Sequence, residues 1–365
     1  MNKSECNTSR FFFKRYRKRF LLFPSTSRTV ILPNMVYGIG NPLIDIFVEM
    51  EDEDLEKLGL HKGTMHLIDE ERRHELLRFI DSKQKIYGCG GSCPNTMVAL
   101  ASFGIRSALA GKINQDHFGE IYRNKLHEIG VDSYLKNGAL PTGSSIILIS
   151  PDSERTMNTF LGACREYGPE DVDGDAIAGA DFFHFTGYMW DTENQKAAIL
   201  YGIEIAKKAG KKVVFDVADP FAVSRNREAF LKLIEEKADL VFANGEEARI
   251  LFDNYDAYEC ARSLGKLGTS GVVKNGKQGS FVVCDGKILR IPVKGKEPVD
   301  TTGAGDMYAA GFILGLSEKR TLFESGLIAS FLAGEIVQRW GAQFPLEEAR
   351  RLKKLIDTVD AEELP

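Results

Sequence analysis

The chain has 365 residues, of which 43% are hydrophobic and 27% charged, so it is long enough for one large α/β domain with an appendage or for two domains. Charges interrupt its apolar stretches well short of the roughly 20 residues that a membrane-spanning helix requires, and we predict no transmembrane segment. The formal charge is −5, but the first 34 residues carry eight basic groups against one acid, which leaves −12 for the rest. An acidic body argues against a nucleic-acid channel and leaves room for small anionic ligands.

Residues 1–34 form a basic, aromatic leader whose apolar pieces are too short for a secretory signal. Two interpretations stay open: an Arg-rich targeting peptide, or an upstream extension of the gene with Met35 as the true start. The second is favoured because a regular strand pattern begins only at Val36. Six cysteines without zinc-ligand spacing predict reduced thiols in a cytoplasmic protein, and all six histidines are isolated.

From Met35 onward a buried strand over 36–40 is followed by Asn-Pro and an alternating segment over 43–48. Short β-type pieces with turn residues recur further on, and we expect a small sheet, a lid formed by about 43–68 and 133–162. The remainder alternates short strands with amphipathic helices, and it contains one hairpin. The expected strands are 181–185, 212–217, 240–243 and 271–273, the clearest helices are 192–209 and 225–237, and the hairpin joins 280–284 to 288–293. This alternation is typical of a parallel sheet covered on both faces by helices.

The strongest motif is Asp300-Thr301-Thr302-Gly303-Ala304-Gly305-Asp306, ahead of a long apolar helix from Met307 to about Leu316. Small residues let the backbone approach a ligand, and the opening turn of a helix presents unpaired N–H groups to an anion. A carboxylate beside such a turn can accept a proton from an attacking hydroxyl while the amides hold a phosphoryl group. The plainer alternative is a glycine-rich connection with Asp306 as a helix-start acid.

This motif resembles the second signature of the ribokinase-like PfkB kinases. The resemblance implies a three-layer α/β/α core with a mostly parallel sheet and a small β-sheet lid, spanning about 35–358. It implies Asp306 as the catalytic base, Gly303, Ala304 and Gly305 as the anion hole, and Thr302 as part of the ATP site.

Two further motifs extend the resemblance to the acceptor side. Gly90-Gly91-Ser92-Cys93-Pro94-Asn95 is similar to the first PfkB signature, in which paired glycines let a polyol lie against the main chain and the Asn95 amide bonds hydroxyls. Gly38 to Asp45 resembles the opening of adenosine kinases. An aspartate after a first strand can accept two hydrogen bonds from a vicinal diol, so we predict that Asp45 and Asn41 bind a ribose.

The nucleotide-side motifs are weaker. Asn244-Gly245-Glu246-Glu247 matches the family's NxxE, whose glutamate supports Mg²⁺ through water, and this implies ATP-site roles for Asn244 and Glu247. Lys274, Gly276 and Gly279 occupy the place of the turn over the ATP phosphates. Arg155 resembles the arginine that moves onto the phosphates when the lid closes.

The matches run from Asn41 to about Pro345, with one departure that bears on specificity. Gly187-Tyr188-Met189-Trp190 stands where many adenosine kinases carry paired phenylalanines, so Tyr188 or Trp190 is expected to stack on the base. We therefore predict an ATP- and Mg²⁺-dependent adenosine kinase. The alternatives are a kinase for ribose, fructose or a related furanose, or for inosine or guanosine.

The resemblance leaves open a K⁺ requirement and whether the protein is a monomer or a homodimer. Two other functions fit the sequence less well. An idle nucleoside-binding regulator conflicts with the complete set of signatures. A dehydrogenase conflicts with the lack of a GxGxxG turn after a strand. No nucleic-acid or membrane partner is expected.

Overall fold

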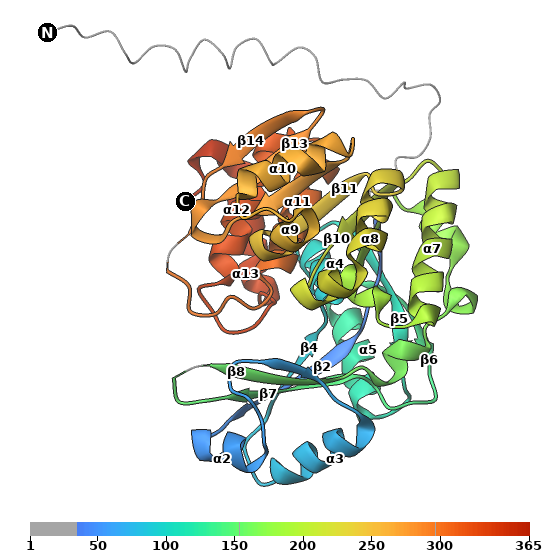
Figure 1. Cartoon of the computed structure of the whole chain (residues 1–365), viewed down its shortest axis with the longest axis vertical. Helices are drawn as coiled ribbons and strands as arrows, with labels where there is room; N and C mark the ends of the chain where they lie inside the picture. The colour runs from blue at the N-terminus through green and yellow to red at the C-terminus, as the bar shows by residue number, and fades with distance from the viewer. Residues whose placement is uncertain (1–34, 153, 296) are drawn as a thin grey trace, which may run out of the picture. The chain divides into compact units, whose positions relative to one another are not determined.

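Strand segments rich in Val, Ile and Phe alternate with amphipathic helices, and they assemble into two sheets with helices packed against them (Figure 1). The computed structural model describes residues 35–152, 154–295 and 297–365. The predicted leader, residues 1–34, and its Cys6 lie outside the described residues.

The large sheet has nine strands in the order β14-β13-β12-β11-β10-β9-β1-β5-β6. Its strands are β1 (Met35–Ile39), β5 (Arg106–Ile113), β6 (Asp132–Asn137), β9 (Phe182–Thr186), β10 (Lys212–Asp216), β11 (Leu240–Asn244), β12 (Ser270–Lys274), β13 (Ser280–Cys284) and β14 (Lys287–Ile291). The seven neighbouring strands β12, β11, β10, β9, β1, β5 and β6 are parallel to one another. The β13–β14 hairpin adds an antiparallel edge beside β12. The expected strands and hairpin are thus present, and the carboxyl ends of the parallel strands share one edge of the sheet.

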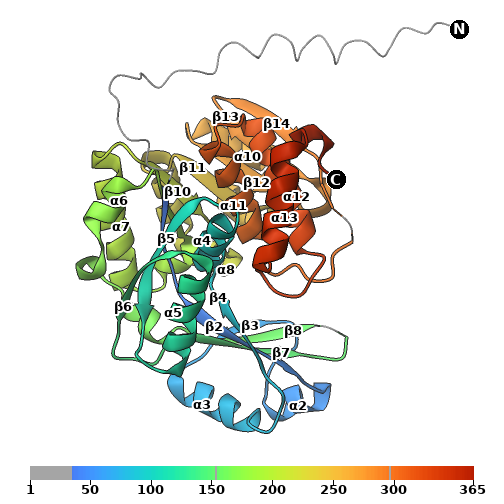
Figure 2. The ribbon, with the colours of Figure 1, turned by 180° about the vertical axis from the view of Figure 1, so that it is seen from behind.

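Helices cover both faces of this sheet, as seen from opposite sides in Figures 1 and 2. One face carries α4 (Ser92–Ser102), α5 (His117–Ile129), α11 (Ala304–Ser317), α12 (Leu322–Ile336) and α13 (Leu346–Thr358). The other carries α6 (Gly174–Gly179), α7 (Glu193–Lys208), α8 (Pro220–Glu236), α9 (Gly245–Phe252) and α10 (Ala257–Lys266). Each face has its own buried apolar core, which confirms the three-layer architecture. In the described part of the chain, no helix is long and apolar enough to cross a membrane.

The small sheet forms the lid and has the strand order β3-β8-β7-β2-β4. Its strands are β2 (Leu43–Glu49), β3 (Met65–Leu67), β4 (Ile86–Gly90), β7 (Ser144–Ile149) and β8 (Arg155–Phe160), with α2 (Asp52–Lys57) and α3 (Glu70–Phe79) beside it. The alternation along β2 buries Ile44, Ile46 and Val48 in the core and directs Leu43 and Asp45 to the other face, into a cavity.

The predicted boundaries of the lid need two corrections. Residues 132–137 form β6 and pair in parallel with β5 at the edge of the large sheet, so the second lid segment begins only at Ser144. Residues 86–90 form β4, which pairs with β2 and was not expected in the lid. A period-2 pattern fixes which side chains share a face, but it does not tell which sheet a strand joins. The folded chain also extends past residue 358, because Ala361 and Leu364 are buried in the core.

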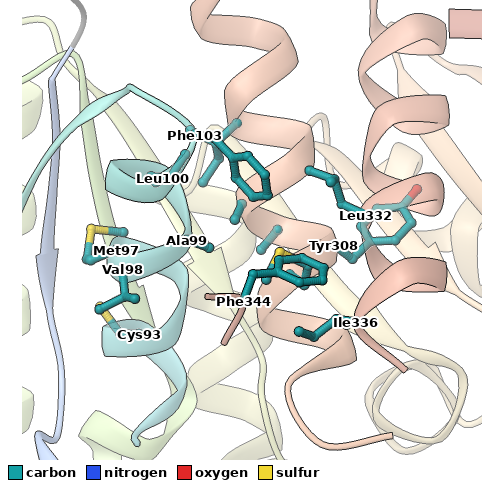
Figure 3. Close-up of a cluster of buried hydrophobic side chains, with 14 of the residues drawn as sticks. Cys93, Met97, Val98, Ala99, Leu100, Phe103, Tyr308, Leu332, Ile336 and Phe344 are labelled. Atoms are coloured by element: carbon teal, nitrogen blue, oxygen red, sulfur yellow. The ribbon is translucent and has the colours of Figure 1, made fainter. Parts of the chain in front are cut away.

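The packing of α4 against α11 joins two segments that are more than 200 residues apart in sequence. Figure 3 shows buried side chains of this region, where Phe103 of α4 lies near Phe344 of a later loop. Phe103 and Phe344 meet edge to face, with ring centroids 6.1 Å apart. This contact brings the first turns of the two helices together, which is where both predicted signatures lie.

Truncating Leu100 tests this packing. Leu100 is fully buried, so Leu100→Ala should lower the free energy of unfolding by about 2–5 kcal/mol through lost apolar contact and a residual cavity. The midpoint of urea unfolding measures the effect. Leu200→Ala on α7 is the matched control, because Leu200 is 38% exposed and the same truncation should cost much less. Equal shifts of the two midpoints would contradict the role given to the α4–α11 contact.

Candidate active site

A cavity of about 1290 Å³ lies at the carboxyl ends of the strands of the large sheet and extends to the lid. Ligands of open parallel sheets bind at this edge, where each strand turns into the following loop. All but two of the predicted site residues line this cavity: Asn41, Asp45, Gly91, Ser92, Asn95, Tyr188, Asn244, Glu247, Lys274, Gly276, Gly279, Thr302, Gly303, Ala304, Gly305 and Asp306. The exceptions are Gly90 and Arg155, which lie just outside.

Asp306, in the first turn of α11, is held by side chains from the first turn of α4. Ser92 Oγ donates to one carboxylate oxygen at 2.6 Å, and Asn95 Nδ2 donates to the other at 2.9 Å. Burial raises the pKa of Asp306 to about 6, although these two hydrogen bonds and Lys274 act in the opposite direction. Such a carboxylate is ionised at neutral pH and is still basic enough to take a proton.

Both helices that meet at Asp306 begin at a glycine with positive φ. Gly91 precedes α4 with φ 102°, and Gly303 precedes α11 with φ 74°. A Cβ on Gly91 would lie 2.1 Å from the carbonyl oxygen of Asn41, and one on Gly303 would lie 2.3 Å from Ala342 Cβ. Only glycine fits these positions, and residues of both helix starts, whose first N–H groups lack partners within the helix, line the cavity.

Gln343 is a contributor that the sequence did not reveal. Its Nε2 donates to the Asn95 side-chain oxygen at 3.0 Å and to the carbonyl of Cys89 at 2.6 Å. Because the Asn95 oxygen accepts from Gln343, the Asn95 NH₂ group must face Asp306. Asn95 and Ser92, which were expected to bind the substrate, are thus engaged in positioning the carboxylate.

The Asp45 carboxylate faces the cavity from β2. A Cβ on Gly90 would lie 2.2 Å from Asp45 Oδ2, so Gly90 leaves the space that this carboxylate fills. Within the described part of the chain no side chain or backbone group donates a hydrogen bond to it. Burial raises the pKa of Asp45 to about 7, with Arg155 lowering it and Asp306 raising it. An open carboxylate in this position can accept hydrogen bonds from two hydroxyl groups.

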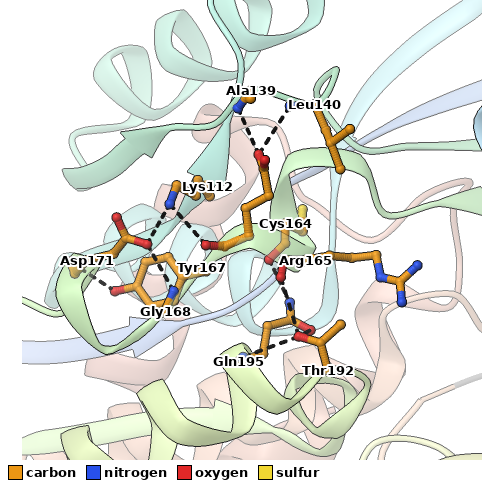
Figure 4. A network of polar contacts seen from close by, with 11 residues as sticks. Lys112, Ala139, Leu140, Cys164, Arg165, Tyr167, Gly168, Asp171, Thr192 and Gln195 are labelled. Carbon is orange, nitrogen blue, oxygen red and sulfur yellow. Dashed lines mark hydrogen bonds and ion pairs between the residues drawn. The ribbon is translucent and has the colours of Figure 1, made fainter.

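A buried glutamine, Gln195, holds the side chain of Asn41 in place. Gln195 Nε2 donates to Asn41 Oδ1 at 2.7 Å and to the carbonyl of Cys164 at 2.8 Å. Figure 4 shows the second contact, together with Thr192 next to Gln195. Since its oxygen is taken, Asn41 has its NH₂ group available to a ligand in the cavity.

Asn244 and Glu247 form a capping box at the start of α9. The Asn244 oxygen accepts from the Glu247 backbone N–H at 2.9 Å, and the Glu247 carboxylate accepts from the Asn244 backbone and side chain at 2.7 and 2.6 Å. Burial raises the pKa of Glu247 to about 7, a shift that Lys274 opposes. Among the described residues no group of three or more His, Cys, Asp or Glu side chains gathers as metal ligands.

Lys274 ends β12, and the turn that follows carries Gly276 and Gly279. Its ammonium pairs with Asp216 Oδ2 at 3.3 Å, and both side chains are largely buried. Asp216, at the end of β10, is a second residue that the sequence analysis missed. Its only signal there is its position at the carboxyl end of an expected strand.

Arg155, at the start of β8, reaches from the lid to the loop before α11. Its guanidinium donates to Asp300 at 2.7 Å and to the Thr302 hydroxyl, and it lies 5.1 Å from the centre of the Trp340 ring. The paired side chains are only 12% and 4% exposed. A role on phosphates, as predicted for Arg155, therefore requires it to leave Asp300.

The two aromatic residues expected to stack on a base have different environments. Trp190 packs into the core, where its ring contacts Phe185, Phe215 and Phe230, and it is 8% exposed. Tyr188 lies at the cavity with 36% of its surface exposed. Trp190 also lines the cavity, but Tyr188 offers more of its surface to a ligand there.

The cavity thus combines a carboxylate that can act as a base, two helix starts that can hold an anion, a buried ammonium and an open carboxylate that can bind a diol. These are the groups that transfer of a phosphoryl group to an alcohol requires.

Comparison with known proteins agrees with this geometry. Residues 55–349 match the pfkB family of carbohydrate kinases. The solved adenosine kinase of Sinorhizobium meliloti is 36% identical with a TM-score of 0.79, and a probable sugar kinase of Rhizobium etli is 34% identical with a TM-score of 0.80; each alignment covers 88% of this chain and 99% of the other. The adenosine kinase of Saccharomyces cerevisiae is 27% identical over 85% of this chain and 96% of its own length. The family match spans most of the sequence and the site has the required groups, so the chain belongs to the pfkB family of carbohydrate kinases and is a kinase.

Proposed function

We propose that this kinase transfers the terminal phosphoryl group of ATP to the 5′-hydroxyl of a nucleoside, and that the nucleoside is adenosine. Asp45 and Asn41 bind the ribose hydroxyls, Tyr188 contacts the base, and Asp306 accepts the proton of the 5′-hydroxyl. The 5′ oxygen then forms a bond to the terminal phosphorus as the bond from phosphorus to the ADP oxygen breaks. The products are AMP and ADP, and the proton passes from Asp306 to solvent.

The residues of the nucleotide side support the cofactor part of the proposal. The turn with Gly276 and Gly279 and the helix start at Gly303, Ala304 and Gly305 would enclose the phosphates, next to Thr302. Three carboxylates, Asp216, Glu247 and Asp306, face the ammonium of Lys274, and a bound cation would offset the remaining negative charge. Mg²⁺ fits there through water on Glu247, and when bound it would neutralise charge on the phosphate oxygens.

The observation that carries the choice of a nucleoside is the apolar wall of the lid. Leu43 of β2, Met65 and Leu67 of β3, Ile147 of β7 and Met157 of β8 line the same cavity as Asp45. The hydroxyls of Ser145 and Thr159 on this wall bond each other at 3.0 Å. An apolar surface opposite a diol-binding carboxylate suits a planar base attached to a ribose better than a second set of sugar hydroxyls.

A sugar kinase is the second candidate, because the Rhizobium etli relative is described as a probable sugar kinase. A panel of adenosine, inosine, guanosine, ribose and fructose, assayed for ADP release with ATP and Mg²⁺, separates the two. We expect the highest kcat/KM for adenosine, and a higher value for either sugar would overturn the proposal. Repeating the assay with sodium in place of potassium measures activation by K⁺.

Replacing the base should abolish transfer and spare nucleotide binding. Asp306→Asn keeps the shape of the side chain but cannot take a proton, so kcat should fall at least about a hundredfold. ATP affinity, measured by calorimetry, should change little. Asp285→Asn is the matched control, because Asp285 lies in the exposed β13–β14 turn. Near-normal turnover of Asp306→Asn would rule out its role as base.

The diol contact predicts a dependence on the ribose hydroxyls. The wild-type enzyme should bind adenosine at least about tenfold more tightly than 2′,3′-dideoxyadenosine, because two hydrogen bonds to Asp45 are lost in the analogue. Asp45→Ala should lose most of this preference and keep only the part that Asn41 provides. A variant that still prefers adenosine by the wild-type factor would contradict the placement of the ribose.

The pH profile follows from the two raised pKa values. Both Asp45, with a pKa of about 7, and Asp306, with a pKa of about 6, act in the ionised form, so kcat/KM should rise between pH 5 and pH 8. Below pH 6 the logarithm of kcat/KM should fall by about two per pH unit, because two groups take up protons. In Asp45→Asn only the step near pH 6 should remain. A profile that is flat from pH 5 to 8 would refute both assignments.

A further inference from the structure

Lys274 is a buried cation that faces three carboxylates at the nucleotide side of the cavity. Burial alone would lower the pKa of Lys274, but the carboxylates of Asp216, Glu247 and Asp306 raise it above its ordinary value. These three groups belong to β10, α9 and α11. His184 of β9 also faces the ammonium, but burial lowers the pKa of His184 to about 4 and leaves it neutral. Lys274 therefore carries a positive charge at neutral pH.

The ammonium lies directly beside the glycine turn that opens α11. A Cβ added to Gly305 would be 3.3 Å from Lys274 Nζ, so nothing stands between the ammonium and this stretch of backbone. Gly303, Ala304 and Gly305 precede Asp306, the base, and contribute the N–H groups of the helix start. Lys274 thus adds a full charge to the peptide dipoles with which this helix start can hold an anion.

Asp216 fixes the direction in which Lys274 points. Its Oδ2 pairs with Lys274 Nζ at 3.3 Å, and its Oδ1 accepts from the backbone N–H of Ala218 at 3.1 Å. Ala218 is not a glycine, yet it has φ 75°, a conformation that costs an alanine free energy. The backbone is thus bent unfavourably at the point where its N–H group anchors the Asp216 carboxylate.

We propose that Lys274 contacts the transferred phosphoryl group of ATP, and that Asp216 is the positioning residue that aims the Lys274 ammonium at it. The ammonium forms and breaks no bond. It balances the negative charge on the oxygens of the phosphoryl group while the 5′ oxygen attacks and ADP leaves. The inference rests on the kinase activity and on the phosphate site of the proposed function, and it does not depend on adenosine being the acceptor.

Binding of two nucleotides tests the contact without an acceptor. Lys274→Met should bind AMP-PNP with Mg²⁺ at least about tenfold more weakly than the wild type, since a charged contact to the terminal phosphate is lost. ADP, which lacks that phosphate, should bind within about twofold of the wild type. Lys266→Met, an exposed lysine at the end of α10, is the matched control. An unchanged ratio of AMP-PNP to ADP affinity in Lys274→Met would overturn the proposal.

Turnover gives an independent readout. With whichever acceptor the wild type uses, Lys274→Met should lower kcat about a hundredfold, and Lys274→Arg, which keeps the charge, should retain more activity. Equal losses in the two variants would contradict a role of the charge. Thermal unfolding of both variants shows whether either loss is a folding defect.

Asp216 is tested by the alkaline side of the pH profile. In Asp216→Asn the carboxylate that contributes most to raising the pKa of Lys274 is gone, so this pKa should fall. The fall of kcat at high pH should then begin at least about one pH unit lower than in the wild type. Replacing a residue with a merely structural role would not shift the pH at which kcat falls on the alkaline side. An unshifted alkaline side in Asp216→Asn would therefore refute the positioning role.

Discussion

Hydrogen bonds that cross from α4 to the carboxylate of Asp306 are the interaction on which the site depends. Burying a carboxylate is unfavourable, and Ser92 and Asn95 offset part of that cost by donating to both of its oxygens. The pKa of Asp306 still stays near 6, close to the range in which a base works best at neutral pH. Because the donors and the acceptor come from different helices, the packing of α4 on α11 is a condition for the chemistry as well as for stability.

Much of this site could be predicted from the sequence, because its residues stand at the ends of strands and the starts of helices. Asn41, Asn244 and Lys274 each follow or end an apolar strand, and the carboxyl ends of parallel strands share one edge. The alternation along β2 likewise placed Asp45 opposite the apolar residues of that strand. Local patterns sufficed wherever the position of a residue follows from the period of its own element.

The features that were missed depend on contacts between distant segments. Gln343 lies in a loop without periodicity, and its partner Asn95 is 248 residues earlier in the chain. Asp216 ends its strand like any polar residue, and its role arises only when parallel pairing through β11 brings Lys274 beside it. The assignment of 132–137 to the wrong sheet has the same origin, because a strand's own pattern does not specify its neighbour.

The ion pair between Arg155 and Asp300 has a consequence for how the enzyme opens. It joins the lid to the loop in front of α11, and both charged groups are shielded from water. Separating them exposes two ions that must be rehydrated at once, so intermediate distances offer neither partner a good environment. A lid that moved away would therefore pass between two positions rather than swing gradually, and any anion that drew Arg155 away would compete with Asp300.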